Sequence, residues 1–440
     1  MMNKRRLCIG ICLVLAVCFA GMAFAADPFS WTKYQGKTVR LLLNKHPYTD
    51  SMLPELDKFQ KLTGMKVVYD IFPEEQYFDK LTVVLSSGSS DYDVFMTGAY
   101  QTWQYAPPGW LEPLEKYIAD SSVTNPNYNV GDILPNLMAS LRWDLTDGHR
   151  TGVGHQWALP WGFEMNSMTY NKRIFDALKL KPPKTFAEVI KDGKLIEQKF
   201  PGTVGIVVRG TRNWGTIHPG FMTGYVSAGG EDFDTNLNPV MNSATGVRYA
   251  KAWVDMVKQV GPAQWATFTW NDCHDAIGSG KAAMFFDADI GGYFINLNTA
   301  EKGNLAFAVG PGLDGPATKS NVWIWSLGMN AASKSKVPAW YWMQWATGKD
   351  FTLAAALNGS LVNPSRQSVW DNADFQKHIA GMTDYLATFK ALSKDAKVYF
   401  TPQSRFMEVT TEWAASLQDI YGGADAKATL DKLATSLKKK

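Results

Sequence analysis

Cysteine is scarce in this sequence, and most of it lies at one end. Of the four cysteines among 440 residues, Cys8, Cys12 and Cys18 fall within the first 25 residues. If this segment is removed, Cys273 alone remains, so the chain cannot form an internal disulfide. One cysteine also excludes a cluster of thiolates around a metal ion. We therefore expect burial of a large core to stabilise the folded chain.

The first 25 residues have the three parts of a secretory signal peptide. Residues 4–6 are basic, residues 7–19 are apolar, and residues 23–25 form an Ala-x-Ala cleavage signal. The apolar run is shorter than the ~20 residues that a membrane span needs. The sequence thus predicts a signal peptide over residues 1–25 and an exported, periplasmic protein that begins at Ala26 or Asp27.

An excess of charge of one sign is also missing. The chain has 44 Lys and Arg residues and 41 Asp and Glu residues, and the signal peptide removes three of the basic ones and none of the acidic ones. No run of Lys or Arg stands out apart from the three terminal residues, Lys438 to Lys440. This pattern gives no support to a nucleic-acid partner.

Motifs of catalysis and of metal binding are absent too. The sequence has no G-x-S-x-G elbow, no G-x-G-x-x-G after a strand and no G-x-x-x-x-G-K-[ST] loop. The histidines lack the spacing of a metal site; they are His46, His149, His155, His218, His274 and His378. We therefore expect no metal, no cofactor and no enzymatic activity.

Aromatic residues are abundant by contrast, with 17 Trp, 17 Tyr and 23 Phe. Large flat side chains suit a protein that packs big cores, stacks on a ligand, or does both. The length of the exported chain is enough for two domains at the usual ~100–200 residues each.

Strands and helices alternate from residue 38 onward. Residues 38–44, 66–72 and 92–98 read as buried strands, and residues 52–64 and 74–88 read as amphipathic helices. This alternation predicts an α/β fold with a mainly parallel sheet. Ligands of such sheets bind at the loops that follow the strands. Candidate ligand-binding residues in these loops are Asn44, Lys45, His46, Glu74, Gln76 and Tyr100.

The alternation begins again in the middle of the chain. Residues 167–171 and 203–208 read as strands with helices between them, and residues 281–287, 305–312 and 321–330 read as further strands. A second set of strands and helices of this kind predicts a second lobe.

Several segments, taken in order, resemble the extracellular solute-binding proteins of ABC importers, the large two-lobed class that includes maltose-binding protein. They are ALPW at 158–161, MTYNKRIFDALKLKPPKTFAEV at 168–189, SGKAAMFFDAD at 279–289, VGPGLDG at 309–315, SLGMNAASKSKVPAWYWMQWATGKD at 326–350 and NGSLVNPSRQS at 358–368. The tryptophan-rich WIWSLGMN is most similar to members that bind linear sugar alcohols or monosaccharides.

The resemblance implies a periplasmic-binding-protein fold of the type II kind, in which two α/β lobes are joined by three crossings. The crossings are expected near residues 162–165, 306–309 and 327–331. The N-terminal lobe then comprises residues 26–162 and 308–330, and the C-terminal lobe comprises residues 163–307 and 331–440.

The resemblance also implies site residues in the cleft between the lobes. Trp161 and Glu164 flank Gly162 and Phe163 at the first crossing, and either Trp323 or Trp325 stacks on the ligand. The remaining candidates implied in this way are Asp287, Asp289 and Arg366. Trp214 and His218 are further candidates because they lie in a loop-like segment, GTRNWGTIHPG, before an expected helix. Carboxylates, arginine and tryptophan together suit a polyol or sugar, whose hydroxyls donate and accept hydrogen bonds and whose C–H faces pack on aromatic rings.

We therefore expect the exported, monomeric binding component of an ABC importer, which captures a neutral polyol or sugar and passes it to the membrane permease. Two alternatives stay open. One is an exported glycosidase, which would need two carboxylates such as Glu164 and Asp287. The other is the same fold with iron or a polyamine as its ligand.

Overall fold

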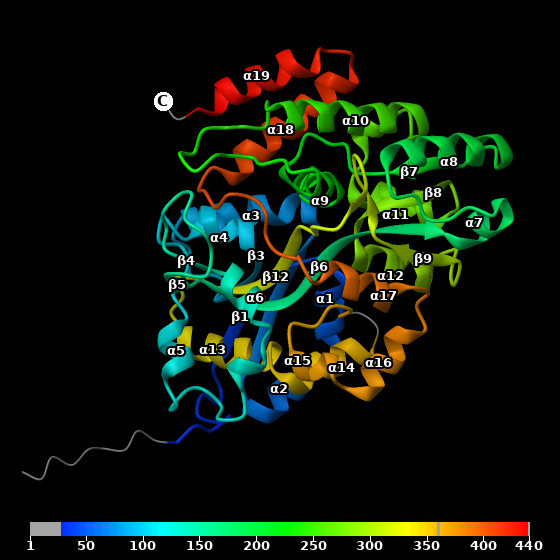
Figure 1. Cartoon of the computed structure of the whole chain (residues 1–440). Coiled ribbons are helices and arrows are strands. Elements are labelled where there is room, and N and C mark those ends of the chain that lie inside the picture. The colour runs from blue at the N-terminus through cyan, green and yellow to red at the C-terminus, as the bar shows by residue number, and fades with distance from the viewer. Residues whose placement is uncertain (1–27, 359–360, 439–440) are drawn as a thin grey trace, which may run out of the picture.

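Two strands run through the middle of the molecule and connect its two halves (Figure 1). The computed structural model describes residues 28–358 and 361–438. Strand β6 (Ala158–Asn171) pairs with β12 (Val322–Met329) through residues 158–165 and with β8 and β9 through residues 166–171. We call the part around β1, β3 and β12 the first half and the part around β7, β8 and β9 the second half.

The first half is built as the sequence predicts. Its strands are β1 (Thr38–Asn44), β2 (Lys66–Phe72) and β3 (Val94–Gly98), with β1 parallel to both of the others. Strand β12 then runs antiparallel to β3, and the order is β2-β1-β3-β12-β6. The helices after these strands are α1 (Pro47–Met52), α2 (Leu56–Thr63), α3 (Glu74–Ser86) and α4 (Ala99–Tyr105).

The first half contains further helices and two short strands (Figure 1). They are α5 (Glu115–Ala119), α6 (Pro135–Ser140), β4 (Arg142–Trp143), β5 (His155–Gln156), α13 (Lys336–Ala346), α14 (Lys349–Leu357), α15 (Gln367–Trp370) and α16 (Ala373–Ala380).

The second half continues the sheet. Strand β7 (Val204–Val207) is parallel to β8 (Ala282–Ala288), whereas β8 and β9 (Leu305–Ala308) are antiparallel to β6. Its helices are α7 (Lys172–Leu178), α8 (Phe186–Lys199), α9 (Gly220–Ser227), α10 (Ala244–Val260), α11 (Trp270–Gly278), α12 (Asp289–Asn298), α17 (Tyr385–Leu392), α18 (Phe406–Tyr421) and α19 (Ala426–Leu437). A small hairpin pairs β10 (Gly310–Pro311) with β11 (Pro316–Ala317).

The two halves meet at the sites where strands change partners. On β6, residue 165 pairs with β12 and residue 166 pairs with β8, so the first crossing lies where the sequence predicts it. At the two other positions that the resemblance implies, the strands do not change partners. Residues 305–308 pair with the second-half part of β6, and Gly312 exchanges backbone hydrogen bonds with Lys184 and Phe186 of the same half. The chain enters the first half only where β12 begins, and residues 327–329 already lie beside β3.

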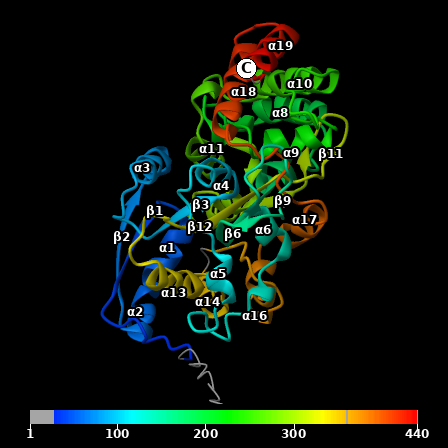
Figure 2. The ribbon, with the colours of Figure 1, turned by 90° about the vertical axis from the view of Figure 1, so that its left-hand side faces the viewer.

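Helix α13 also differs from the expected arrangement, in which the chain returns to the second lobe at residue 331. This helix packs on β1 and β12, and its Tyr341 ring lies 5.2 Å from the ring of Phe29. Helix α17 packs on β6 and β9, and α18 and α19 pack on α10 (Figure 2). The lobe boundaries themselves stay a prediction.

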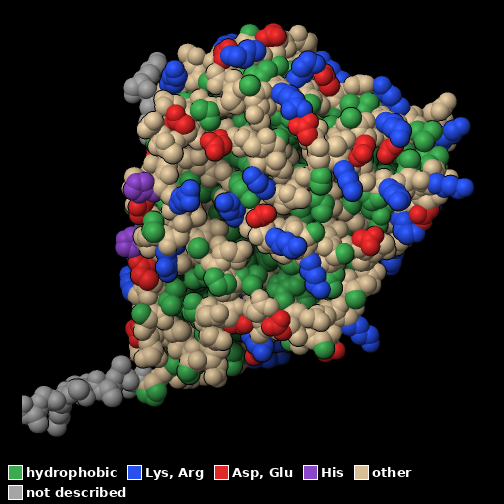
Figure 3. All heavy atoms as spheres, viewed as in Figure 1, with side chains coloured by type: hydrophobic (Ala, Val, Ile, Leu, Met, Phe, Trp, Pro, Cys, Tyr) green, Lys and Arg blue, Asp and Glu red, His purple; other side chains and the backbone are tan. Residues whose placement is uncertain are grey.

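Most of the aromatic side chains belong to the core. Trp340 and Trp342 of α13 are fully buried in the first half, and Trp413 of α18 packs edge-on against Phe221 and Tyr225 in the second. Within residues 28–358 and 361–438, no helix combines the length and the apolar character needed to cross a membrane. Charges of both signs are interspersed over the surface in Figure 3. The predicted signal peptide lies outside the described residues.

Candidate functional site

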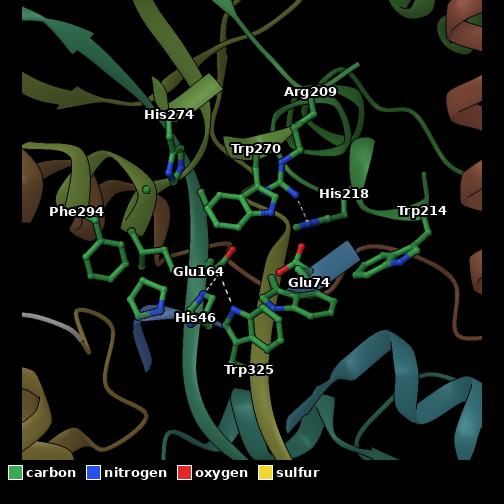
Figure 4. Close-up of a pocket in the computed structure, with 15 residues that line it drawn as sticks. His46, Glu74, Glu164, Arg209, Trp214, His218, Trp270, His274, Phe294 and Trp325 are labelled. Carbon is green, nitrogen blue, oxygen red and sulfur yellow. Dashed lines mark hydrogen bonds and ion pairs between the residues drawn. The ribbon is translucent and has the colours of Figure 1, made fainter. Parts of the chain in front are cut away.

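A cavity of about 120 Å³ lies where the two halves face each other across β6 and β12 (Figure 4). Both halves contribute walls, so the space exists only when they are close together. It is lined by His46, Pro47, Glu74, Glu164, Arg209, Trp214, His218, Trp270, His274, Ala288, Ile290, Gly291, Phe294, Trp323 and Trp325.

Two carboxylates and two indole rings form the first-half wall. Glu164 of β6 lies directly opposite Trp323 of β12, and Trp325 lies opposite Gly162, so these side chains share one face of the sheet. The indole N–H of Trp325 donates to Oε1 of Glu164 (2.8 Å). Glu74 is the first residue of α3, and Nδ2 of Asn44 donates to its Oε2 (3.0 Å).

The second-half wall is centred on an ion pair. Arg209 follows β7, and Asp287 lies on the neighbouring strand β8. Nε and Nη2 of Arg209 donate to the two carboxylate oxygens of Asp287 at 2.8 and 2.6 Å, a bidentate geometry. Nη1 of the same guanidinium donates to the carbonyl oxygen of Gly215 (3.1 Å). Since Asp287 is almost completely buried, this pairing fixes the position of Arg209.

Helices α11 and α12 complete that wall. Trp270 and His274 are four residues apart on α11 and therefore lie on the same side of the helix. Helix α11 starts at a capping box between Thr269 and Asp272, which sets the position of its first turn. Gly291 of α12 lies so near His274 that an added Cβ would come within 2.3 Å of its Nε2.

The three histidines of the cavity are uncharged at neutral pH. Burial lowers the pKa of His46 and of His274 to about 4, and burial together with Arg209 lowers the pKa of His218. Nδ1 of His46 accepts the backbone N–H of Tyr48 (3.1 Å), so its proton is on Nε2.

The charged groups respond to burial in different ways. Burial raises the pKa of Glu164 to about 7 although Arg209 acts in the opposite direction, and burial likewise raises the pKa of Glu74. Burial also opposes the charge of Arg209, but Asp287 outweighs it and raises the pKa of Arg209 above its ordinary value.

Aromatic rings surround these polar groups. The rings of Trp323 and Trp325 meet edge-to-face with centroids 5.0 Å apart, and Trp214 lies 5.4 Å from Trp323. Such faces can pack against the C–H groups of a polyhydroxylated ligand, while the carboxylates and the guanidinium bind its hydroxyls.

Seven of the predicted site residues line this cavity, namely His46, Glu74, Glu164, Trp214, His218, Trp323 and Trp325. Asn44 and Asp287 do not line the cavity but contact residues that do. Asn44 donates a hydrogen bond to Glu74, and Asp287 accepts hydrogen bonds from Arg209. Tyr100 is also behind the wall: its ring contacts Trp323 and His218, and its hydroxyl donates to the carbonyl of Val322.

Five other predicted residues are placed elsewhere. Lys45 is exposed and pairs with Asp50, and Gln76 is exposed on α3. Trp161 is buried with its ring 6.5 Å from that of Phe351.

Asp289 and Arg366 have structural contacts instead of cavity contacts. Asp289 accepts the backbone N–H of Met165 (3.1 Å) and two bonds from Nδ2 of Asn363. The guanidinium of Arg366 is fully buried in the first half, where it donates to the carbonyl of Thr347 and to Asp132.

Four further residues that line the cavity were not predicted from the sequence, namely Arg209, Trp270, His274 and Phe294. Arg209 follows a predicted strand, so the rule applied to the loops of the first half would have found it. Trp270 and His274 gave no such signal, since a helix start with an aromatic residue is equally typical of core packing. Within the described part of the chain, no group of three His, Cys, Asp or Glu residues could hold a metal ion.

A second and larger cavity of about 400 Å³ lies on the opposite face of the crossing strands. Phe163, Met165 and Val322 alternate with Glu164 and Trp323 and therefore point toward this other side. Its walls are mostly apolar, with side chains from α6, α16 and α17, and hydrophobic side chains gather across the middle of this face in Figure 3. Its walls lack the paired carboxylates and the arginine of the first cavity.

Comparison with known proteins gives matches over most of the chain. The family model for bacterial extracellular solute-binding proteins matches residues 46–351. An erythritol/L-threitol-binding protein of Mycolicibacterium smegmatis is 41% identical over 420 residues, which are 94% of this chain and 88% of that protein.

Solved structures show the same fold. A solute-binding protein of an ABC transporter from Agrobacterium vitis, solved with bound D-mannitol, has a TM-score of 0.77 at 23% identity and covers 91% of this chain and 97% of its own. Another from Agrobacterium radiobacter, in complex with ribitol, has a TM-score of 0.80 at 20% identity and covers 92% of this chain and 98% of its own.

Proposed function

Since the chain belongs to the family of bacterial extracellular solute-binding proteins, we propose that it captures a small linear polyol in the cavity between its halves and delivers it to the permease of an ABC importer. The 41% identical relative is named for erythritol and L-threitol, which are small linear polyols, and its name supports a ligand of this class. We further propose that the chain is exported to the periplasm through residues 1–25 and acts there as a monomer.

The observation that carries this proposal is the division of hydrogen-bonding groups between the two walls. Glu74 and Glu164 of the first half can accept, and Arg209 and the indole N–H of Trp270 in the second half can donate. A hydroxyl both donates and accepts, so a ligand with several adjacent hydroxyls could connect the two walls at several points.

The size of the cavity supports a small ligand. One water molecule needs roughly 10–15 Å³ of such space, so about 120 Å³ holds on the order of ten non-hydrogen atoms. A linear polyol with a four- to six-carbon chain fits this space, whereas a disaccharide exceeds it.

The chemistry of the walls favours a polyhydroxylated ligand over a polyamine. Arg209 donates hydrogen bonds and cannot accept them, so it can bind a hydroxyl oxygen but not an ammonium group. A glycosidase is also less well supported, because Asp287 is bound by Arg209 at both oxygens and does not line the cavity.

A thermal-shift series on the mature chain, residues 26–440, tests the proposal. We expect meso-erythritol or L-threitol to stabilise the chain by about 2.7 kcal/mol at 100 times Kd. The Glu164→Ala variant should lose this stabilisation, and the Asp50→Asn variant, altered at an exposed carboxylate near the cavity, should keep it.

Ribitol and D-mannitol belong in the same series, with maltose and spermidine as ligands that should not bind. Chromatography of the recovered polyol should show it unchanged. Stabilisation by spermidine alone, or cleavage of any sugar, would contradict the proposed function.

A further inference from the structure

The acidic groups around the cavity outnumber the cationic ones. Glu74 and Glu164 face the cavity from the first half, and Asp287 lies behind the opposite wall. Among the described residues that line the cavity, Arg209 is the single Lys or Arg. If all three carboxyl groups were ionised, the cluster would carry two uncompensated negative charges among largely aromatic walls.

Arg209 already has hydrogen-bond partners within the protein. Two of its N–H groups donate to Asp287 in the bidentate pair, and a third donates to the carbonyl of Gly215. Glu74 and Glu164 each receive one hydrogen bond from a neutral donor, Asn44 and Trp325 respectively. Their charges therefore lack a paired cation of their own, which is costly in a buried site.

The histidines around the cavity cannot supply the missing charge. Nδ1 of His46 accepts a hydrogen bond from the N–H of Tyr48 and therefore cannot carry a proton itself. The ring stays neutral, although its Nε2 lies 3.7 Å from Oε1 of Glu164. Nε2 of His218 faces an N–H of Arg209 at 3.4 Å and must accept from it, because a guanidinium only donates. His274 lies between the rings of Trp270 and Phe285.

We propose that the Glu74–Glu164 pair takes up about one proton when the cavity closes on its ligand, so that one carboxylate and one carboxylic acid face the ligand. This inference rests on the proposed function. In the open protein, water solvates both carboxylates, and closure replaces this water with aromatic walls. The direction of the pKa shifts, upward for both groups through burial, agrees with the proton uptake.

The protonated carboxyl group makes the pair specific for hydroxyls. A carboxylic acid donates one hydrogen bond and still accepts, whereas two carboxylates only accept. An alcohol oxygen that receives this proton can in turn donate to the other carboxylate. A polyol fulfils both demands, while a carbonyl or carboxylate group at the same place could not donate.

The sign of the pH dependence follows from this linkage. A glutamate in water has a pKa of about 4.3, which we expect for both carboxyls in the open protein, whereas burial in the structure raises the pKa of Glu164 to about 7. Between these values the open form loses the proton that the closed form keeps, so Kd rises with pH by up to about tenfold per pH unit. Above about 7 the dependence levels off, since both forms are then deprotonated.

Isothermal titration with meso-erythritol and L-threitol tests the proposal. At pH 6, titrations in two buffers of different ionisation enthalpy give the number of protons bound with the ligand. We expect about one proton at pH 6 and a value close to zero at pH 8.5. Binding without proton uptake at pH 6 would overturn the inference and leave the proposed function intact, whereas the absence of binding to any polyol contradicts the proposed function and the inference falls with it.

Two variants assign the proton to the pair. Glu164→Gln imitates the protonated form, so the binding that it retains should show little pH dependence and little proton uptake. Glu74→Gln should keep part of the uptake, because burial raises the pKa of Glu164. Asp50→Asn removes the exposed carboxylate next to Lys45 and should keep the wild-type uptake. Asp289→Asn tests the competing site, the buried carboxyl behind β6, whose pKa burial also raises to about 7. Uptake kept in Asp289→Asn and lost in Glu164→Gln assigns the proton to the pair. Loss of proton uptake in Asp289→Asn but not in Glu164→Gln would contradict the assignment to this pair.

Discussion

At the residue scale, the chemistry of the cavity depends on which charges have partners. Arg209 and Asp287 come from neighbouring strands and neutralise each other with little access to water, at side-chain exposures of 11% and 1%. Neither residue is free to move, so the guanidinium can serve as a fixed donor to a ligand. A fixed donor costs little entropy on binding, which favours affinity for a flexible polyol.

The Arg209–Asp287 pair should be far more important for stability than a similar pair at the surface. Arg209→Gln leaves Asp287 buried without a cation, so we expect the free energy of unfolding to fall by about 3–5 kcal/mol. The matched control is Arg212→Gln, whose partner Asp419 and own side chain are more than half exposed. That change should cost about 0–1 kcal/mol.

Urea denaturation of both variants at neutral pH measures the difference. Polyol affinity should also fall in Arg209→Gln and stay unchanged in Arg212→Gln. Equal losses of stability in the two variants would contradict the role given to the buried pair.

At the element scale, successive side chains of the crossing strands point to opposite faces, and the two faces line different cavities. On β6 and β12, Glu164, Trp323 and Trp325 face the cavity between the halves, while Phe163 and Val322 face the apolar cavity on the other side of the strands. A shift of register by one residue would exchange the two sets. The pairing of β12 with β3 and β6 on its two sides prevents such a shift.

The end of strand β3 should be sensitive to substitution, because Gly98 lies against the ring of Trp323. An added Cβ at Gly98 would lie 2.4 Å from the Trp323 ring and 2.8 Å from the side chain of Gln101. Gly98→Ala should therefore push Trp323 toward the cavity, cost about 1–3 kcal/mol of stability, and weaken polyol binding.

Gly315 provides the control, because an added Cβ there meets no atom within 4 Å. Gly315→Ala should leave melting temperature and Kd unchanged. Thermal melts and titration calorimetry measure the two effects, and wild-type affinity in Gly98→Ala would show that the position of Trp323 is unimportant.

At the scale of the whole molecule, the cavity exists because two halves approach each other over the crossing strands. Side chains from α11 and α12 in the second half close over carboxylates from α3 and β6 in the first. Hinge closure around a ligand is a common mode of domain motion, and the ligand favours the closed form by its greater affinity for it.

Solution X-ray scattering should detect this closure. We expect the radius of gyration of the mature chain to decrease when meso-erythritol or L-threitol is added, and to approach the value calculated from the closed structure. Maltose, which exceeds the cavity, is the control and should change nothing. Identical scattering curves with and without a polyol that binds would show that the halves do not move.

The sequence alone determined the features that depend on local pattern. The alternation of apolar strands and amphipathic helices predicted an α/β fold. Positions on β6 and β12 and in the segments after β1, β2 and β7 gave seven residues of the cavity. Strand ends and strand faces are local properties, because a period of two and the burial of apolar side chains fix them wherever the strand lies.

The tertiary structure decided which distant groups meet. Arg209 and Asp287 are separated by 78 residues, and only the pairing of β7 with β8 brings them together. Arg366 and Asp289, by contrast, are residue types that could bind a ligand, but they hydrogen-bond to buried backbone groups instead. Arg366 donates to the carbonyl of Thr347, and Asp289 accepts from the N–H of Met165. A buried charge takes the partner that the fold brings within reach, and that partner cannot be read from spacing along the chain.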